Sequence, residues 1–259
     1  MLPMLLYNAE CWQEISDETI QHLDNIQNKF YKCLFAVGSG CPTTALYTET
    51  WGVMMKYRIL MKKLMFLHHL STLPDETLAR EIFEVQKRLN LPGLFQECQE
   101  FLIKFGITKI ESFSPFQWKN VVKKNIAEMN RTDILNQMKK SKKMSYDKYF
   151  EKDFKRQDYL TSLNLADARL RFKLNAAMTP TVKMNFPSDE VFSSQMWSCS
   201  GCGNSEEGSD LAGSRDTQQH IILCPGYEDL RENKNLEDDK DLVKYFSQVI
   251  KRRQDLNNV

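Results

Sequence analysis

The sequence has no long uninterrupted run of hydrophobic residues. Its longest apolar stretch, residues 1–6, and shorter ones such as residues 65–67 fall far short of the ~20 residues that cross a bilayer. No basic leader precedes the first stretch, so we expect neither a secretory signal nor a membrane-spanning segment. Hydrophobic residues make up 42% and charged residues 27% of the chain. These proportions are typical of globular proteins and exclude a disordered tail, a collagen-like rod and a membrane channel.

Signals for β-structure are also missing. The chain contains no Asn-Gly hairpin turn, no convincing alternation of apolar and polar residues, and no internal repeat. Apolar residues instead recur every three or four positions, as in an amphipathic helix. After a possible N-cap at Ser16, one such stripe comprises Ile20, Leu23, Ile26, Phe30 and Leu34. We therefore predict a mainly α fold.

Similar patterns predict further helices over residues 53–70, 75–91, 94–105, 115–138 and 166–177. The helix over 53–70 is almost continuously apolar and is expected to be buried, with its basic side chains on an open face (Lys56, Arg58, Lys62 and Lys63). The helix over 75–91 should bury a regular stripe (Leu78, Ile82, Val85 and Leu89).

The sequence changes character near residue 185, where we place a boundary. Residues 1–185 form the predicted helical region, and residues 186–259 form a smaller C-terminal module. Within the module, residues 203–216 are rich in Gly, Ser and acids and predict a flexible loop. A short amphipathic helix is predicted from Asp241, with Leu242, Tyr245, Phe246 and Val249 on its apolar face.

The seven cysteines are odd in number and unevenly spaced, which argues against a secreted disulfide framework and for an intracellular protein. Four residues have the spacing C-x2-C-x17-H-x3-C: Cys199, Cys202, His220 and Cys224. The C-x2-C turn and the His-x3-Cys helical turn could each supply two ligands to one Zn²⁺. Such a closed set would be structural, because it leaves no position for water. The alternative is four residues that hold no metal.

The net charge of +1 hides a strong segregation. Residues 101–173 hold 17 Lys and Arg against 8 Asp and Glu, whereas residues 1–100 and 186–259 are acidic. Aromatic residues interrupt the most basic stretch, 139–157, and could stack on bases (Tyr146, Tyr149 and Phe150). Eight basic residues are candidate phosphate contacts: Lys139, Lys140, Lys142, Lys143, Lys155, Arg156, Arg169 and Arg171. The alternative is an ordinary solvated helical surface.

The run WSCSGCGN…DTQQHIILCPGYEDLRE resembles the C-terminal Cys-Cys-His-Cys module of LINE-type (non-LTR) retrotransposon reverse transcriptases. Three upstream segments are also similar to that family: LPMLLYNAECW, TTALYTETWGVMMKYRILMKKLMFLHHL and ADARLRFKLNAAM. Asn8 stands where the family usually has Gly. The resemblance covers about residues 1–233 and implies a region that follows the polymerase core, binds zinc, and handles RNA or DNA.

The acidic residues that a polymerase needs are missing. No Tyr-x-Asp-Asp motif and no other Asp pair between apolar strands is present to hold catalytic metal ions. We therefore expect no enzymatic activity and a nucleic-acid-binding role, in the nucleus or the cytoplasm. Two alternatives stay open. One is a protein-interaction piece that associates or self-associates through exposed apolar helices, with residues 1–6 and 53–67 as the expected faces. The other is a retroelement remnant with no function.

Overall fold

The computed structural model describes residues 2–140, 156–176 and 218–257 of the chain. These residues form helices joined by turns and loops, and no strand occurs among them. The prediction of a mainly α fold is thereby confirmed. None of the helices in the described ranges is long and apolar enough to cross a membrane.

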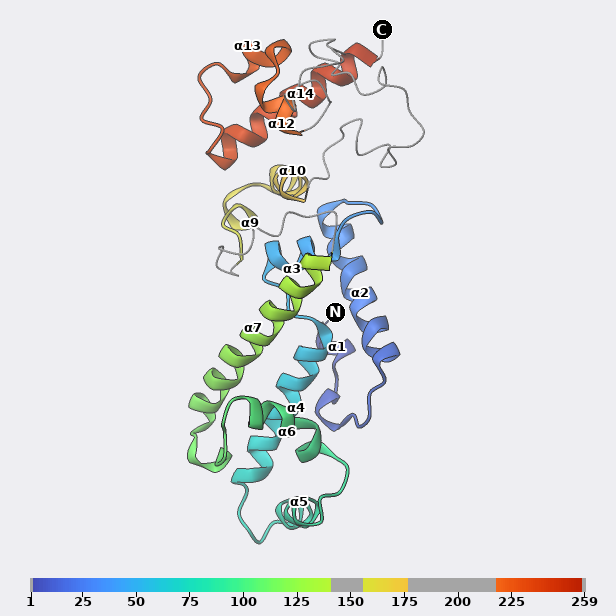
Figure 1. Cartoon of the computed structure of the whole chain (residues 1–259), viewed down its shortest axis with the longest axis vertical. Coiled ribbons are helices and arrows are strands. Elements are labelled where there is room, and N and C mark those ends of the chain that lie inside the picture. Colours follow the sequence, from blue (N-terminus) through green and yellow to red (C-terminus); the bar gives the residue numbers. More distant parts are fainter. Residues whose placement is uncertain (1, 141–155, 177–217, 258–259) are drawn as a thin grey trace. The chain divides into compact units, whose positions relative to one another are not determined.

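The chain divides into two compact units, one of residues 1–30 with 51–154 and the other of residues 31–50 with 155–259 (Figure 1). The helix α2 (Asp17–Phe35) contributes to both units. The predicted boundary near residue 185 and the predicted loop 203–216 lie outside the described residues.

The first unit is organised around one helix, α4 (Met55–Thr72). Its neighbours are η1 (Ala9–Cys11), α5 (Leu78–Arg88), α6 (Leu94–Lys104), η2 (Ile110–Ser112) and α7 (Pro115–Lys140), while α1 (Leu2–Leu5) opens the chain. Met55, Tyr57, Ile59, Leu64 and Leu67 are buried, as the composition of this helix predicts, and its other apolar side chains are partly buried. The stretch 53–67 is therefore largely covered inside the unit, with Met61, Met65 and Phe66 partly accessible. At the other expected face, Leu6 is buried and Met4 is exposed.

The long helix α7 packs on α4 along residues spaced four apart: Trp118, Val122, Ile126, Asn130, Ile134 and Met138. The indole Nε1 of Trp118 donates to the Leu64 carbonyl at 2.9 Å, and the Trp118 ring stacks on His68. Asn130 accepts from the Met54 N–H at 3.1 Å and donates to the Gly52 carbonyl at 2.9 Å. Side chains thus satisfy the backbone groups just before α4, where the helix itself cannot.

Two sequence predictions about side-chain placement in this unit are wrong. Lys63 is not on an open face: its side chain is buried, and its ammonium contacts Glu97 at 2.6 Å. The apolar stripe of α5 is not buried either, because α5 packs on its neighbours through Phe83 on its opposite face. In α2, Leu23 is partly buried, and Ile26, Phe30 and Leu34 toward the end of the stripe are 40% to 48% exposed.

The second unit combines the end of α2 with α3 (Thr43–Thr50), α9 (Tyr159–Ser162), α10 (Leu165–Asn175), α12 (Gln218–Leu223), η4 (Pro225–Tyr227), α13 (Glu228–Arg231) and α14 (Asp239–Asn257). Its core joins Leu174 of α10 to the C-terminal helices, with Ile221, Cys224, Tyr227, Tyr245, Phe246 and Val249. The predicted C-terminal helix is thus confirmed, and its apolar face is buried.

Candidate nucleic-acid interface

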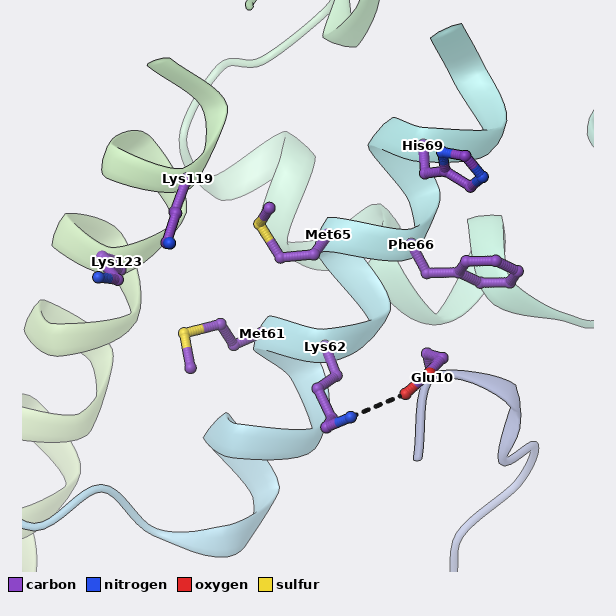
Figure 2. Close-up of a pocket in the computed structure, with 8 residues that line it drawn as sticks. All are labelled: Glu10, Met61, Lys62, Met65, Phe66, His69, Lys119 and Lys123. Atoms are coloured by element: carbon purple, nitrogen blue, oxygen red, sulfur yellow. Dashed lines mark hydrogen bonds and ion pairs between the residues drawn. The ribbon is translucent and has the colours of Figure 1, made fainter. Parts of the chain in front are cut away.

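A groove of about 410 Å³ lies between α4 and α7 in the first unit (Figure 2). Its lining combines apolar and basic side chains: Met61, Lys62, Met65, Phe66 and His69 of α4, Lys119 and Lys123 of α7, and Glu10. The volume falls within the range of small-molecule sites. The groove therefore presents apolar surface and positive charge side by side.

The packing of α7 explains why two lysines face this groove. Trp118 and Val122 are fully buried against α4, so the residues that follow each of them, Lys119 and Lys123, project outward one helical turn apart. Both lysine side chains are exposed. Figure 2 shows Met61 and Met65 pointing from α4 toward the two lysines. The groove thus has a cationic rim beside an apolar floor.

Within the described part of the chain, the positive charges of the groove are neutralised by an acid on the α4 side but not on the α7 side. On the α4 side, the Lys62 ammonium contacts the Glu10 carboxylate at 3.0 Å. A backbone N–H and Lys62 donate hydrogen bonds to Glu10 and hold the pKa of this carboxyl below its usual range. Among the described residues, neither Lys119 nor Lys123 forms an ion pair. The α7 rim therefore keeps two positive charges available to an anion.

Five of the eight basic residues predicted to bind phosphate lie in the described ranges, and they are divided between the two units. Lys139 and Lys140 are exposed at the end of α7 in the first unit, whereas Arg156, Arg169 and Arg171 belong to the second unit. Lys142, Lys143 and Lys155, and the aromatic residues between them, lie outside the described residues.

The two arginines of α10 make bonds within the second unit. Arg171 contacts the Asp239 carboxylate at 2.5 Å and donates to the Asn175 side chain at 2.6 Å. Arg169 donates from Nε to the Leu34 carbonyl at 2.7 Å. Because Arg171 is paired with an acid and only about one-fifth exposed, its main role in the structure is to join α10 to the start of α14.

Two of the four predicted zinc ligands can be placed. His220 lies in α12, and Cys224 follows the end of that helix with an extended backbone (φ −59°, ψ 125°). Both side chains are buried, and Cys224 belongs to the core of the second unit. Cys199 and Cys202 lie outside the described residues, so the described ranges hold no cluster of three or more possible metal ligands.

The arrangement around Cys224 is well anchored. The guanidinium of Arg231 donates to the carbonyls of Ile222 and Cys224 at 2.8 Å each. The Tyr245 hydroxyl donates to the Ile221 carbonyl at 2.5 Å. These bonds satisfy the carbonyls at the end of α12, where helices leave acceptors without partners. A buried imidazole and a buried thiol held close in sequence suit Zn²⁺, which prefers nitrogen and sulfur ligands.

Sequence analysis did not identify the α4–α7 groove. Lys62 and Lys119 are far apart in the sequence, and only the contact between α4 and α7 brings them to one site. The available signal was the pair Lys119 and Lys123, each directly after a residue of the buried face of α7. That signal shows that the two lysines point outward, but not what lies beside them.

No family model, no curated protein and no solved structure matches this chain.

Proposed function

We propose that this chain is a nucleic-acid-binding protein related to the C-terminal part of LINE-type reverse transcriptases, and that it acts without a polymerase site of its own. The observation that carries the proposal is the cationic rim of the α4–α7 groove. Lys119 and Lys123 supply positive charge that no described acid neutralises. Association with polyanions depends on such charge, since each phosphate contact releases counterions.

The floor of the groove favours nucleotides over simple anions. Phe66 offers a ring on the α4 side, next to His69, whose ring centre is 6.3 Å from that of Phe66. Proteins that bind single strands combine a basic groove with aromatic side chains on which bases stack. A single-stranded segment could place a phosphate at Lys119 and Lys123 and a base over the apolar floor.

Further basic residues lie along α7 beyond the groove and would offer separate phosphate contacts. Lys139 and Lys140 follow Lys119 and Lys123 along α7 and are exposed at its end. The basic segment 139–157 continues from that point in the sequence. Arg171 contributes less in this proposal, because its guanidinium is already paired with Asp239.

The test compares a groove variant with a charge-matched control. In Lys119→Gln/Lys123→Gln, binding to single-stranded RNA should weaken, and the slope of log K against log salt should become less steep by about 1.4, from two contacts of about 0.7 each. The control Lys240→Gln/Lys244→Gln removes two exposed lysines of α14 and should leave the slope unchanged. Equal slopes for the wild type and the groove variant would exclude the groove as the phosphate site.

We further propose that Cys199, Cys202, His220 and Cys224 hold a structural Zn²⁺ in this chain. The donor types support this, with His220 and Cys224 buried at the end of α12. When bound, the ion would cross-link the segment containing Cys199 and Cys202 to the core of the second unit.

This site predicts about one equivalent of zinc in the purified chain. Cys224→Ser should lose the metal, because one of four ligands is gone, and metal analysis of the dialysed protein measures the loss. Cys11→Ser is the matched control: Cys11 is exposed in the first unit and should not affect zinc content. Full zinc occupancy in Cys224→Ser would remove this residue from the ligand set.

A further inference from the structure

The helix α5 leaves a regular apolar stripe in contact with solvent. Leu78, Ile82, Val85 and the C-cap residue Leu89 follow one another at steps of four, three and four, so they line up along one face of the helix and its end. Their exposed fractions are 70%, 51%, 40% and 58%. A face of this kind normally packs against another surface, and an exposed apolar patch marks an interaction site.

The opposite face of α5 attaches the helix to its own unit. Phe83 is only 2% exposed and meets the ring of Phe95 edge-on. Arg80 lies over the Phe83 ring, donates to the Leu70 carbonyl at 3.2 Å and pairs with Glu84. Lys87 lies over the Phe95 ring. These contacts fix the rotation of α5, so the helix cannot turn its stripe inward without losing them.

The stripe has the spacing of a coiled-coil seam. In that register Ile82 and Leu89 are at a positions, and Leu78 and Val85 are at d positions. The two g positions beside the seam are Glu81 and Arg88. Both are exposed, and neither forms an ion pair with any described residue. One acid and one base thus flank the same edge of the apolar stripe.

We propose that α5 pairs with α5 of a second copy of this chain, antiparallel and about a two-fold axis. In this arrangement Leu78 lies opposite Leu89 of the second copy, and Ile82 lies opposite Val85 of the second copy. Residues at g face each other across an antiparallel pair, so Glu81 meets Arg88 of the second copy on both sides of the axis. A parallel pair would place Glu81 against Gln86 of the second copy and Arg88 against position 93, beyond the end of α5, and would leave the charges unmatched.

The size of the surface sets the strength of this dimer. One 11-residue helix per copy buries less than the roughly 1,200 Å² of standard interfaces. The dimer should therefore be weak and form only as the protein concentration rises. No residue of α5 lines the α4–α7 groove. The test of dimerisation is therefore independent of the test of nucleic-acid binding.

Charge exchange provides the test, with sedimentation velocity of the full chain over a range of concentrations. The wild type should show a concentration-dependent dimer. Glu81→Arg places Arg against Arg, and Arg88→Glu places Glu against Glu, so each variant alone should be monomeric at concentrations where the wild type dimerises. An equal mixture of the two variants should dimerise again, because every pair in the mixed dimer is then complementary. The double variant Glu81→Arg/Arg88→Glu should also dimerise.

Three controls keep the result interpretable. Glu76→Arg changes the same charge at an exposed position before α5 and should dimerise like the wild type. Circular dichroism of each variant establishes that it is folded. Ile82→Arg should abolish the dimer, since it places a charge at the centre of the seam.

Three outcomes would overturn the proposal. A wild type that is monomeric at every concentration would exclude a second copy as the occupant. A dimer that is insensitive to Ile82→Arg and to the charge exchanges would place the interface elsewhere. Binding of the monomeric wild type to vesicles of anionic phospholipid, lost in Ile82→Arg, would assign the stripe to a lipid surface instead.

Discussion

Helices α14 and α5 both carry a regular apolar stripe, but the stripe of α14 is buried in its own unit and the stripe of α5 is exposed. In α14 the stripe contains Tyr245, Phe246 and Val249, which are at most 1% exposed and form the centre of the second unit's core. In α5 the four stripe residues are 40% to 70% exposed, and the helix is attached by its other face. An amphipathic pattern therefore shows that a helix has an apolar face, but not that its own unit covers that face.

The two helices differ in the apolar side chains that neighbouring elements place against them. α14 lies against α10 and α13 and meets apolar side chains there, including Leu170, Leu174 and Leu230. α5 packs on α4 and α6, and it contributes Phe83 to that contact. Beside Phe83, Arg80 lies over the ring and forms an ion pair with Glu84 at the edge of this contact. Phe83 and the polar contacts around it thus orient α5 with its apolar stripe outward.

The largest effect is predicted in α14. Phe246→Ala should lower the free energy of unfolding by about 3–5 kcal/mol, because it opens a cavity in a fully buried core. Urea denaturation followed by circular dichroism measures this. A loss below about 1 kcal/mol would mean that the α14 face is not a packed core.

A smaller, pH-dependent effect is predicted where polar side chains join α4 to α7. Burial opposes ionisation of Asp133, but hydrogen bonds from Lys56 and from Tyr57 (2.7 Å) outweigh it, so the pKa of Asp133 is lowered. A carboxyl with a lowered pKa stabilises the fold above its unfolded pKa of about 3.9, and this contribution is lost as the pH falls through the folded pKa.

Asp133→Asn should therefore cost about 1 kcal/mol at pH 7, a value reduced by the partial exposure of Lys56. The difference from the wild type should shrink as the pH falls below about 4. Denaturation at several pH values measures it, with Tyr57→Phe as the matched variant that removes one bond to Asp133 and keeps the ring. A cost that is constant from pH 7 to pH 3 would contradict the role of the ionised carboxylate.

The smallest effect is predicted on the stripe of α5. Ile82→Ser should change the stability of the monomer by less than about 0.5 kcal/mol, because this side chain contributes little to the folded core. Dilute protein, below the concentration at which copies associate, is required for this measurement. Its neighbour Phe83→Ala, on the attached face, should cost about 3 kcal/mol in the same assay. Similar costs for the two variants would show that the stripe is covered within the chain.

Helix starts were predictable from local chemistry. The Ser16 hydroxyl accepts from the Thr19 N–H at 3.2 Å, as expected of an N-cap. At Ser114 a capping box forms, in which Ser114 and Gln117 each accept from the other's N–H. These signals involve residues three positions apart, so the sequence alone contains them.

Features that depend on distant contacts were not predictable. The short helix α3 has no apolar stripe, and it is buried almost throughout because neighbours of the second unit surround it. Its Glu49 carboxylate is covered and accepts from Tyr159 and Asn175 at 2.9 Å each. The burial of Lys63 likewise depends on Glu97, 34 positions away. No pattern within one helix identifies such partners.

The two candidate sites, the zinc ligands and the basic groove, were predictable in part. The sequence identified His220 and Cys224, and both are buried at the end of α12. It also indicated that the middle of the chain is basic, but it pointed to residues 139–157 and not to the groove. Lys119 and Lys123 became candidates only when the structure showed that they line one groove with Phe66 and the methionines of α4.

The most direct test of the proposed function is to map where RNA contacts the chain. Ultraviolet cross-linking of the wild-type protein to single-stranded RNA, followed by mass spectrometry, would identify the peptides involved. We predict cross-links in the peptides that contain Phe66 of α4 and Lys119 or Lys123 of α7. Cross-links confined to α14 or to other peptides, with none in these two, would contradict the assignment of the groove.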